Sequence, residues 1–102
     1  MVTTLITGKR SELDLLCRRF GVRRLEVFGS ASTERFDPAH SDLDFLVEFE
    51  PATSGFADRY FGLLEAMEDL FGREVDLLES PAMRNPYFIR QIAPTRVVLY
   101  AA

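Results

Sequence analysis

The apolar positions of the chain follow two periods, one typical of helices and one typical of strands. Between residues 10 and 20 they recur at the i, i+3, i+4, i+7 spacing of an amphipathic helix, which Gly21 would end. The residues of this stripe are Leu13, Leu16, Cys17 and Phe20. A longer stripe of the same period runs from residue 60 to 71 and ends before Gly72, so it predicts a second helix of about four turns.

The stretch DLDFLVEFE, residues 42–50, alternates between apolar and other side chains. Because successive side chains of a strand point to opposite faces, this pattern predicts a strand with one face in the core. The predicted core face carries Leu43, Phe45, Val47 and Phe49. Further strands are predicted at 23–28, 73–80 and 96–100, and a short helix at 87–93.

Polar and turn-forming residues separate these segments. Residues 31–41 are polar and contain a proline, residues 51–55 (PATSG) form a turn cluster, and Pro81 and Pro86 bracket another connection. The order is therefore helix, strand, strand, helix, strand, helix, strand. It predicts an α+β fold, a mixed β-sheet with helices packed on one side, and one domain over residues 1–102.

The composition disfavours two classes of function, extended nucleic-acid binding and membrane association. A net charge of −4 disfavours extended nucleic-acid binding, which needs clustered basic residues. No apolar run is long enough for a membrane span, so we expect no membrane partner. The single cysteine, Cys17, cannot form an internal disulfide, and its helical spacing predicts a buried side chain in a cytoplasmic protein. The single histidine, His40, is expected to be solvated in the loop before Ser41.

Two aspartates begin the strand at 42–50. Residues two apart on a strand share a face with Cα atoms about 6.5–7 Å apart, so Asp42 and Asp44 project together. Two charges at that separation repel by roughly 2 kcal/mol at an effective dielectric constant of about 20. Placing two aspartates on one face of the strand therefore destabilises the fold without a structural benefit of its own. The alternative is that Asp42 caps a turn with Ser41 and that Asp44 merely faces solvent.

Asp76 adds a third carboxylate, set between apolar residues in a segment expected to be a largely buried strand. A buried carboxylate needs a partner, and Arg73 is a candidate for an ion pair. If the two strands are neighbours, however, three carboxylates meet on one face. Such oxygen ligands select Mg²⁺ or Mn²⁺, and two ions about 3.5–4 Å apart can stabilise the attacking and leaving oxygens of a phosphoryl transfer.

Gly29 and Ser30 follow the strand at 23–28 and precede this carboxylate strand. Glycine lets the backbone approach a ligand closely, and a serine hydroxyl together with the N–H groups of a following helical turn can bind phosphate oxygens. A Gly-Ser pair alone is a weak signal. In combination with Asp42, Asp44 and Asp76 it predicts a nucleotide-binding turn.

The segments VFGS, SDLDFLVEF and REVDLLES resemble the minimal nucleotidyltransferase (MNT) group of the DNA polymerase beta-like nucleotidyltransferases, which includes MntA-like antitoxins. The resemblance extends to the closing IRQIAPTRVVLY. It implies a polymerase beta-like fold in which Asp42 and Asp44 bind two Mg²⁺ ions. It further implies that Asp76 binds the catalytic ion and helps to activate the acceptor hydroxyl, while Gly29 and Ser30 hold the triphosphate.

The resemblance also implies transfer of AMP from ATP to a hydroxyl, with a HEPN-domain toxin as the partner and acceptor. We expect a homodimer or a hetero-oligomer. Family members commonly have an arginine and a glycine soon after the Gly-Ser pair, whereas this chain has ASTERF at 31–36, with Arg35 as the single arginine. Two alternatives stay open. One is a binding-only antitoxin or adaptor, and the other is a homodimeric nucleotidyltransferase that modifies an antibiotic.

Overall fold

The computed structural model describes residues 2–51, 55–79 and 85–102. Within them, a four-stranded sheet has the strand order β3-β2-β1-β4. The strands are β1 (Val22–Phe28), β2 (Leu43–Phe49), β3 (Val75–Glu79) and β4 (Val97–Ala101). The helices are α1 (Thr4–Thr7), α2 (Arg10–Arg19), α3 (Phe56–Phe71) and α4 (Pro86–Ile92), with the short 3-10 helices η1 (Gly29–Ser32) and η3 (Ala93–Thr95).

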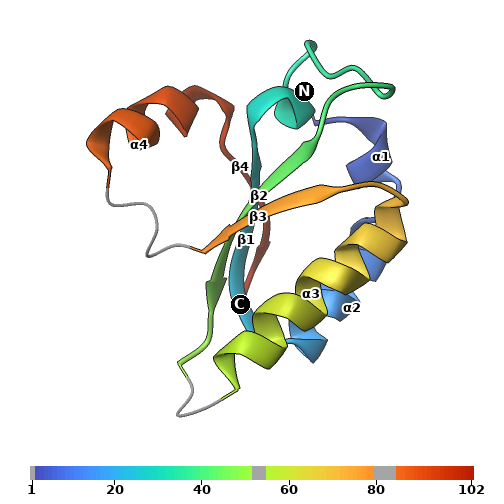
Figure 1. The fold of residues 1–102 in the computed structure, drawn as a ribbon, viewed down its shortest axis with the longest axis vertical. Helices are drawn as coiled ribbons and strands as arrows, with labels where there is room; N and C mark the ends of the chain where they lie inside the picture. Colours follow the sequence, from blue (N-terminus) through green and yellow to red (C-terminus); the bar gives the residue numbers. More distant parts are fainter. Residues whose placement is uncertain (1, 52–54, 80–84) are drawn as a thin grey trace.

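The sheet is mixed, as predicted. β1 pairs antiparallel with both β2 and β4, whereas β2 pairs parallel with β3. A parallel pair cannot be joined by a tight hairpin, so the chain needs a crossover, and α3 is that crossover between β2 and β3. Figure 1 shows α3 running diagonally beside the sheet. The parallel pairing gives β2 and β3 a common direction, so both strands begin at the same edge of the sheet.

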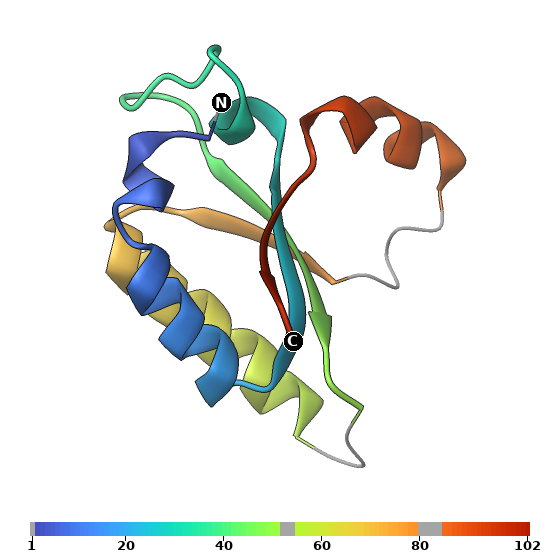
Figure 2. The ribbon, with the colours of Figure 1, turned by 180° about the vertical axis from the view of Figure 1, so that it is seen from behind.

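One face of the sheet is covered by α2 and α3, which contact each other and lie side by side in both views (Figures 1 and 2). The main core lies beneath them. Leu43, Phe45 and Val47 of β2 are fully buried in it, which confirms the predicted alternation of this strand. Cys17 of α2 is buried as well, and burial raises the pKa of its thiol to about 12, so it is a core residue and not a nucleophile.

The opposite face carries a smaller apolar cluster in which Phe28 of β1, Leu46 of β2 and Ile92 of α4 are buried. The predicted packing of helices on one side thus holds for α2 and α3, while the short α4 packs on the other face. Figures 1 and 2 show α4 apart from the α2–α3 layer. Because α4 covers only part of this face, the side chains at the beginning of β2 and β3 stay accessible.

Several element boundaries differ from the sequence prediction. α3 begins at Phe56, about one turn before the apolar stripe starts, and α1 was not predicted because a four-residue helix is too short to show a period. Parts of the expected turn at 51–55 and of the connection between Pro81 and Pro86 lie outside the described residues. None of the helices in the described ranges combines the length and apolar character needed to cross a membrane.

Candidate active site

The pairing of β2 with β3 brings two of the predicted carboxylates together. Asp44 and Asp76 are direct partners in the parallel register. The residues on either side of Asp44 in β2, Leu43 and Phe45, point into the main core. Asp44 therefore lies on the opposite, partly open face of the sheet. The two carboxyl groups are close enough to share a hydrogen bond. The condition on which the sequence prediction rests, that these two strands are neighbours, is therefore met.

The surroundings of Asp44 disfavour its charged form. Its pKa is raised to about 6, chiefly by burial, then by the charge of Asp76 and the hydrogen bond with it, and least by the charge of Asp42. Near neutral pH, two carboxylates in register thus repel each other in a half-buried setting. A cation at this position would relieve that repulsion.

Asp76 is exposed, so the expectation that it lies in a largely buried strand is wrong. The apolar residues around it have different neighbours: Val75 and Leu77 enter the main core, while Leu78 packs against the cluster beneath α4. β3 is also an edge strand, which leaves the open face at Asp76 accessible. An exposed carboxylate at this position can contact a second molecule.

Asp42 directly precedes β2 and is exposed. Within the described residues, no three or more His, Cys, Asp or Glu side chains are grouped so as to hold a metal ion by themselves. The donor chemistry nevertheless fits a hard divalent cation, because Mg²⁺ and Mn²⁺ take one or two carboxylates and complete their shells with water and substrate phosphates. Asp44 and Asp76 would supply the paired carboxylates, with Asp42 beside them.

Gly29 lies against the carboxylate of Asp44. Its φ is +74°, and a Cβ at this position would lie 2.6 Å from Oδ2 of Asp44. No side chain fits there without moving the carboxylate. The register explains this contact, since Phe28 is the partner of Asp44 on β1 and the chain turns into η1 at the next residue.

The turn at Gly29–Ser32 is held by the segment before β4. The Gly29 N–H donates to Thr95 Oγ1 (2.9 Å), and that hydroxyl donates to the Ile92 carbonyl (2.8 Å). The Ser32 hydroxyl donates to the carbonyls of Gly29 and Thr95. The Gly29 amide is therefore already paired, whereas the Ser30 hydroxyl has no hydrogen bond within the described part of the chain. Sequence reasoning missed Thr95 and Ser32, because no local pattern links positions so far apart.

A cavity of about 650 Å³ adjoins this turn. Its lining consists of Ser32, Thr33, Glu34, Arg35, Pro94 and Thr95. The exposed Arg35 brings a positive charge to its wall, and the exposed Glu34 beside it brings a negative one. The cavity thus extends from the Gly29–Ser32 turn along the segment in which the sequence departs from the common family pattern.

The described residues support neither sequence alternative for the aspartates. Arg73 donates to the carbonyls of Pro38 and Ser41, so its guanidinium is engaged away from Asp76. The Ser41 hydroxyl accepts from the Asp37 N–H, so the turn is closed by Asp37 and Ser41, without a cap from Asp42. His40 is exposed, as predicted, with Nδ1 2.8 Å from Oδ2 of Asp37.

Comparison with known families identifies the family to which the chain belongs. The chain matches the nucleotidyltransferase domain family over residues 10–99. It belongs to this family. The protein is therefore a nucleotidyltransferase, and the resemblance to minimal nucleotidyltransferases inferred from the sequence is confirmed.

Individual relatives support this assignment. The chain is 33% identical over 84 residues to the protein adenylyltransferase MntA of Thermococcus cleftensis, which covers 82% of this chain and 79% of the relative. It is 31% identical over 84 residues to a provisionally named protein adenylyltransferase of Methanocaldococcus jannaschii, which covers 81% of this chain and 82% of the relative.

Solved structures share the fold. One provisionally named minimal nucleotidyltransferase superimposes with a TM-score of 0.75 at 29% identity, over 95% of each chain. A complex of a tri-AMPylated Shewanella oneidensis HEPN toxin with its MNT antitoxin matches with a TM-score of 0.62 at 15% identity, over 94% of this chain and 72% of that chain. The predicted α+β nucleotidyltransferase fold is thus confirmed.

Proposed function

We propose that this nucleotidyltransferase transfers AMP from ATP to a hydroxyl group of a partner protein, with Mg²⁺ or Mn²⁺ as the cofactor. The observation that carries the proposal is the register pair of Asp44 and Asp76, in which Asp44 lies against the Gly29 turn. One carboxylate is half-buried with a raised pKa, and the other is exposed at an edge strand. In this arrangement Asp44 can bind a cation beside the phosphate, and Asp76 can contact the acceptor hydroxyl.

In the proposed reaction the acceptor oxygen attacks the α-phosphorus of ATP, the bond between that phosphorus and the bridging oxygen breaks, and pyrophosphate leaves. The exposed Asp76 accepts the proton of the acceptor hydroxyl, while Asp42 and Asp44 face the phosphate oxygens. Bound divalent cations, two in the expected scheme, would supply the positive charge that offsets the triphosphate. The protein's own contribution is positioning and electrostatics.

The Ser30 hydroxyl and Arg35 are the proposed protein contacts of the triphosphate. Ser30 lies in the turn beside Asp44, and Arg35 lines the adjacent cavity of about 650 Å³. A guanidinium matches phosphate oxygens in geometry and charge. Arg35 would then serve in place of the arginine that family members commonly carry nearer to the Gly-Ser pair.

The proposed acceptor is a HEPN-domain toxin, which would give this chain an antitoxin role. The name of the Thermococcus relative and the AMPylated toxin in the Shewanella complex support this inference. Leu15 and Phe61, on the outer surfaces of α2 and α3, are 65% and 64% exposed. Exposed apolar side chains of this size are consistent with a homodimer or a hetero-oligomer.

A labelling experiment tests the proposal. The protein is incubated with Mg²⁺, the product of the neighbouring gene and ATP labelled either at the α- or the γ-phosphate. AMP transfer places only the α-label on the partner chain. Label from γ-phosphate on the partner would instead indicate a kinase, and no label on either chain, with normal nucleotide binding, would contradict the proposal.

A binding-only antitoxin is the second candidate. It is favoured by the Gly29 amide, which is already bonded to Thr95 and so is not free for a phosphate oxygen. Under this alternative the partner is neutralised by complex formation alone. The Asp76 variant described at the end of the Discussion separates the two candidates.

A further inference from the structure

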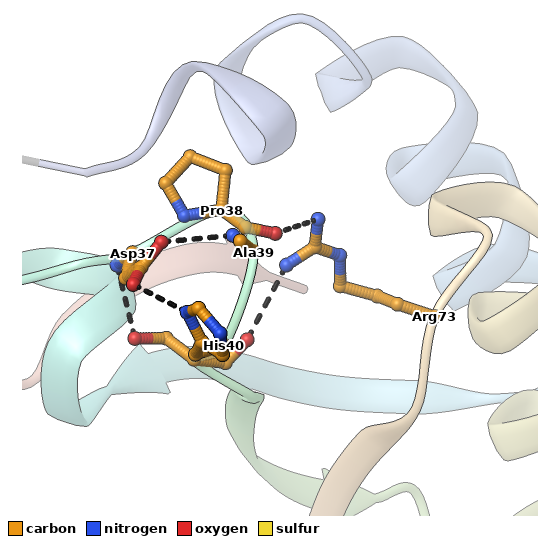
Figure 3. A network of polar contacts seen from close by, with 6 residues as sticks. Asp37, Pro38, Ala39, His40 and Arg73 are labelled. Carbon is orange, nitrogen blue, oxygen red and sulfur yellow. Dashed lines mark hydrogen bonds and ion pairs between the residues drawn. The ribbon is translucent and has the colours of Figure 1, made fainter.

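Arg73 connects the loop before β2 to the corner between α3 and β3. Its Nη2 donates to the Pro38 carbonyl (2.8 Å) and its Nη1 to the Ser41 carbonyl (3.3 Å), as Figure 3 shows. The guanidinium carbon also lies 5.5 Å from the centre of the Phe36 ring. A planar guanidinium can make these contacts at once, whereas a lysine ammonium cannot reproduce this geometry.

The loop that Arg73 binds is tied together internally. The Asp37 N–H donates to Ser41 Oγ (2.9 Å), and the Ser41 N–H donates back to the Asp37 carbonyl (2.8 Å). Asp37 Oδ1 accepts from the Ala39 N–H (2.9 Å), as seen in Figure 3. Residues 37–41 therefore form one closed turn, and a contact to any part of it restrains the whole turn.

This restraint acts directly on the site. Asp42 follows Ser41 in the chain, and Asp76 lies on the strand that begins just after Arg73. The Arg73 side chain thus links the segment before Asp42 to the segment before Asp76. We propose that Arg73 is a positioning residue that fixes Asp42 relative to Asp44 and Asp76. The proposal deepens the function proposed above and rests on it for the role of Asp42.

Arg59 provides a matched comparison at the other end of the same strand. Its Nη1 donates to the Glu50 carbonyl (2.9 Å), and its guanidinium carbon lies 5.0 Å from the centre of the Phe49 ring. Arg59 and Arg73 each also have a buried Nε without a hydrogen bond in the described part of the structure. The two arginines hold opposite ends of β2 by similar contacts, but the contacts of Arg73 lie at the end of β2 that Asp42 precedes.

The test measures Mn²⁺ binding by electron paramagnetic resonance, with and without a non-hydrolysable ATP analogue, in Arg73→Met, Arg73→Lys and Arg59→Met. Thermal unfolding shows which variants are folded and how far each is destabilised. Arg73→Met should weaken Mn²⁺ binding by about tenfold, because the turn before Asp42 loses its restraint and loss of outer-shell support weakens metal sites by about this factor. Arg73→Lys should recover part of this loss. Arg59→Met should bind Mn²⁺ within about twofold of wild type, since distant sites are usually independent.

The outcomes are distinct. Wild-type Mn²⁺ affinity in a folded Arg73 variant overturns the proposal, and so does an equal loss in Arg59→Met, because the effect would then be general destabilisation. If Arg73→Met does not fold, Arg73→Lys decides. Absence of Mn²⁺ binding by the wild type also overturns it. Absence of AMP transfer, together with the expected pattern of Mn²⁺ affinities, would contradict the proposed function and leave the positioning role supported.

Discussion

The backbone of Gly29 lies so close to the carboxylate of Asp44 that a Cβ at residue 29 would be 2.6 Å from Oδ2. The turn proposed to bind phosphate and the carboxylate proposed to bind the cation are therefore in direct contact. A side chain added at residue 29 would therefore displace the Asp44 carboxylate. This contact makes the site sensitive to substitutions that would be mild elsewhere.

Gly29→Ala tests this contact. Alanine at φ +74° is strained, and its methyl group also meets Asp44, so we expect a loss of about 1–3 kcal/mol in the free energy of unfolding and a severe loss of nucleotide transfer. Gly72→Ala is the matched control, because Gly72 has φ +65° and a Cβ there would have no atom within 4 Å. Urea unfolding should show strain in both variants. Equal activity in both variants would mean that the Gly29 contact is irrelevant to the reaction.

The raised pKa of Asp44 predicts that the free energy of unfolding depends on pH between about 4 and 6. Its pKa is raised from 3.8 to about 6 in the folded protein, mainly by burial and by Asp76. Between these values the native state binds more protons than the unfolded state, so this group's contribution to stability falls as pH rises. The unfavourable contribution is complete above about pH 6 and absent below about pH 4.

Asp44→Asn should therefore stabilise the metal-free protein near pH 7.5 by roughly 1–2 kcal/mol, allowing for partial solvent screening, and by little near pH 4. Urea unfolding in the presence of a chelator measures the difference at both pH values. A variant that is less stable than wild type near pH 7.5 would contradict the view that Asp44 is electrostatically unfavourable in the metal-free fold.

The same variant should lose its response to cations. A ligand that binds only the native state at a concentration about one hundred times its Kd stabilises by about 2.7 kcal/mol, so Mn²⁺ should raise the Tm of the wild type measurably. Asp44→Asn should abolish most of this rise. Asp58→Asn, at an exposed position in the first turn of α3, is the control and should respond as wild type does. Equal responses in all three proteins would exclude Asp44 as a cation ligand.

Thr95→Val tests whether the Gly29 turn depends on the segment before β4. Valine keeps the shape of threonine but removes the acceptor of the Gly29 N–H. Leaving this amide unpaired should cost about 1–3 kcal/mol of unfolding free energy. We also expect a higher KM for the nucleotide, measured in the transfer assay, since the phosphate-binding turn is no longer held in place. Thr95→Ser retains the hydroxyl and should restore both quantities.

The strands could be predicted because they depend on local periodicity, whereas the sequence predicts the meeting of Asp44 and Asp76 only on the condition that their strands are neighbours. The alternation from Asp42 to Phe49 fixes which side chains of β2 face the core, and the helix after it requires a crossover to the next strand. The neighbouring position of Asp44 and Asp76 then follows from the pairing of the strands that this crossover joins.

Contacts between distant segments could not be predicted in the same way. Arg73 is near Asp76 in sequence, yet its long side chain reaches the carbonyls of the loop before β2. The pairing of Gly29 with Thr95 depends on where η3 packs after α4. The exposure of Asp76 depends on which strand lies at the edge of the sheet, and the apolar residues beside it give no information about that.

The most direct test of the proposed catalysis compares Asp76→Asn with the wild type. Asp76 is exposed, and β2 separates its strand from β1 and the turn at Gly29, so the variant should fold, bind nucleotide and bind its partner. AMP transfer from α-labelled ATP should fall by orders of magnitude, because the lost interaction forms mainly in the transition state. Neutralisation of the partner should fail with it. If Asp76→Asn folds, binds nucleotide and neutralises the partner as well as wild type, the protein acts by binding, and the proposed catalytic role is contradicted.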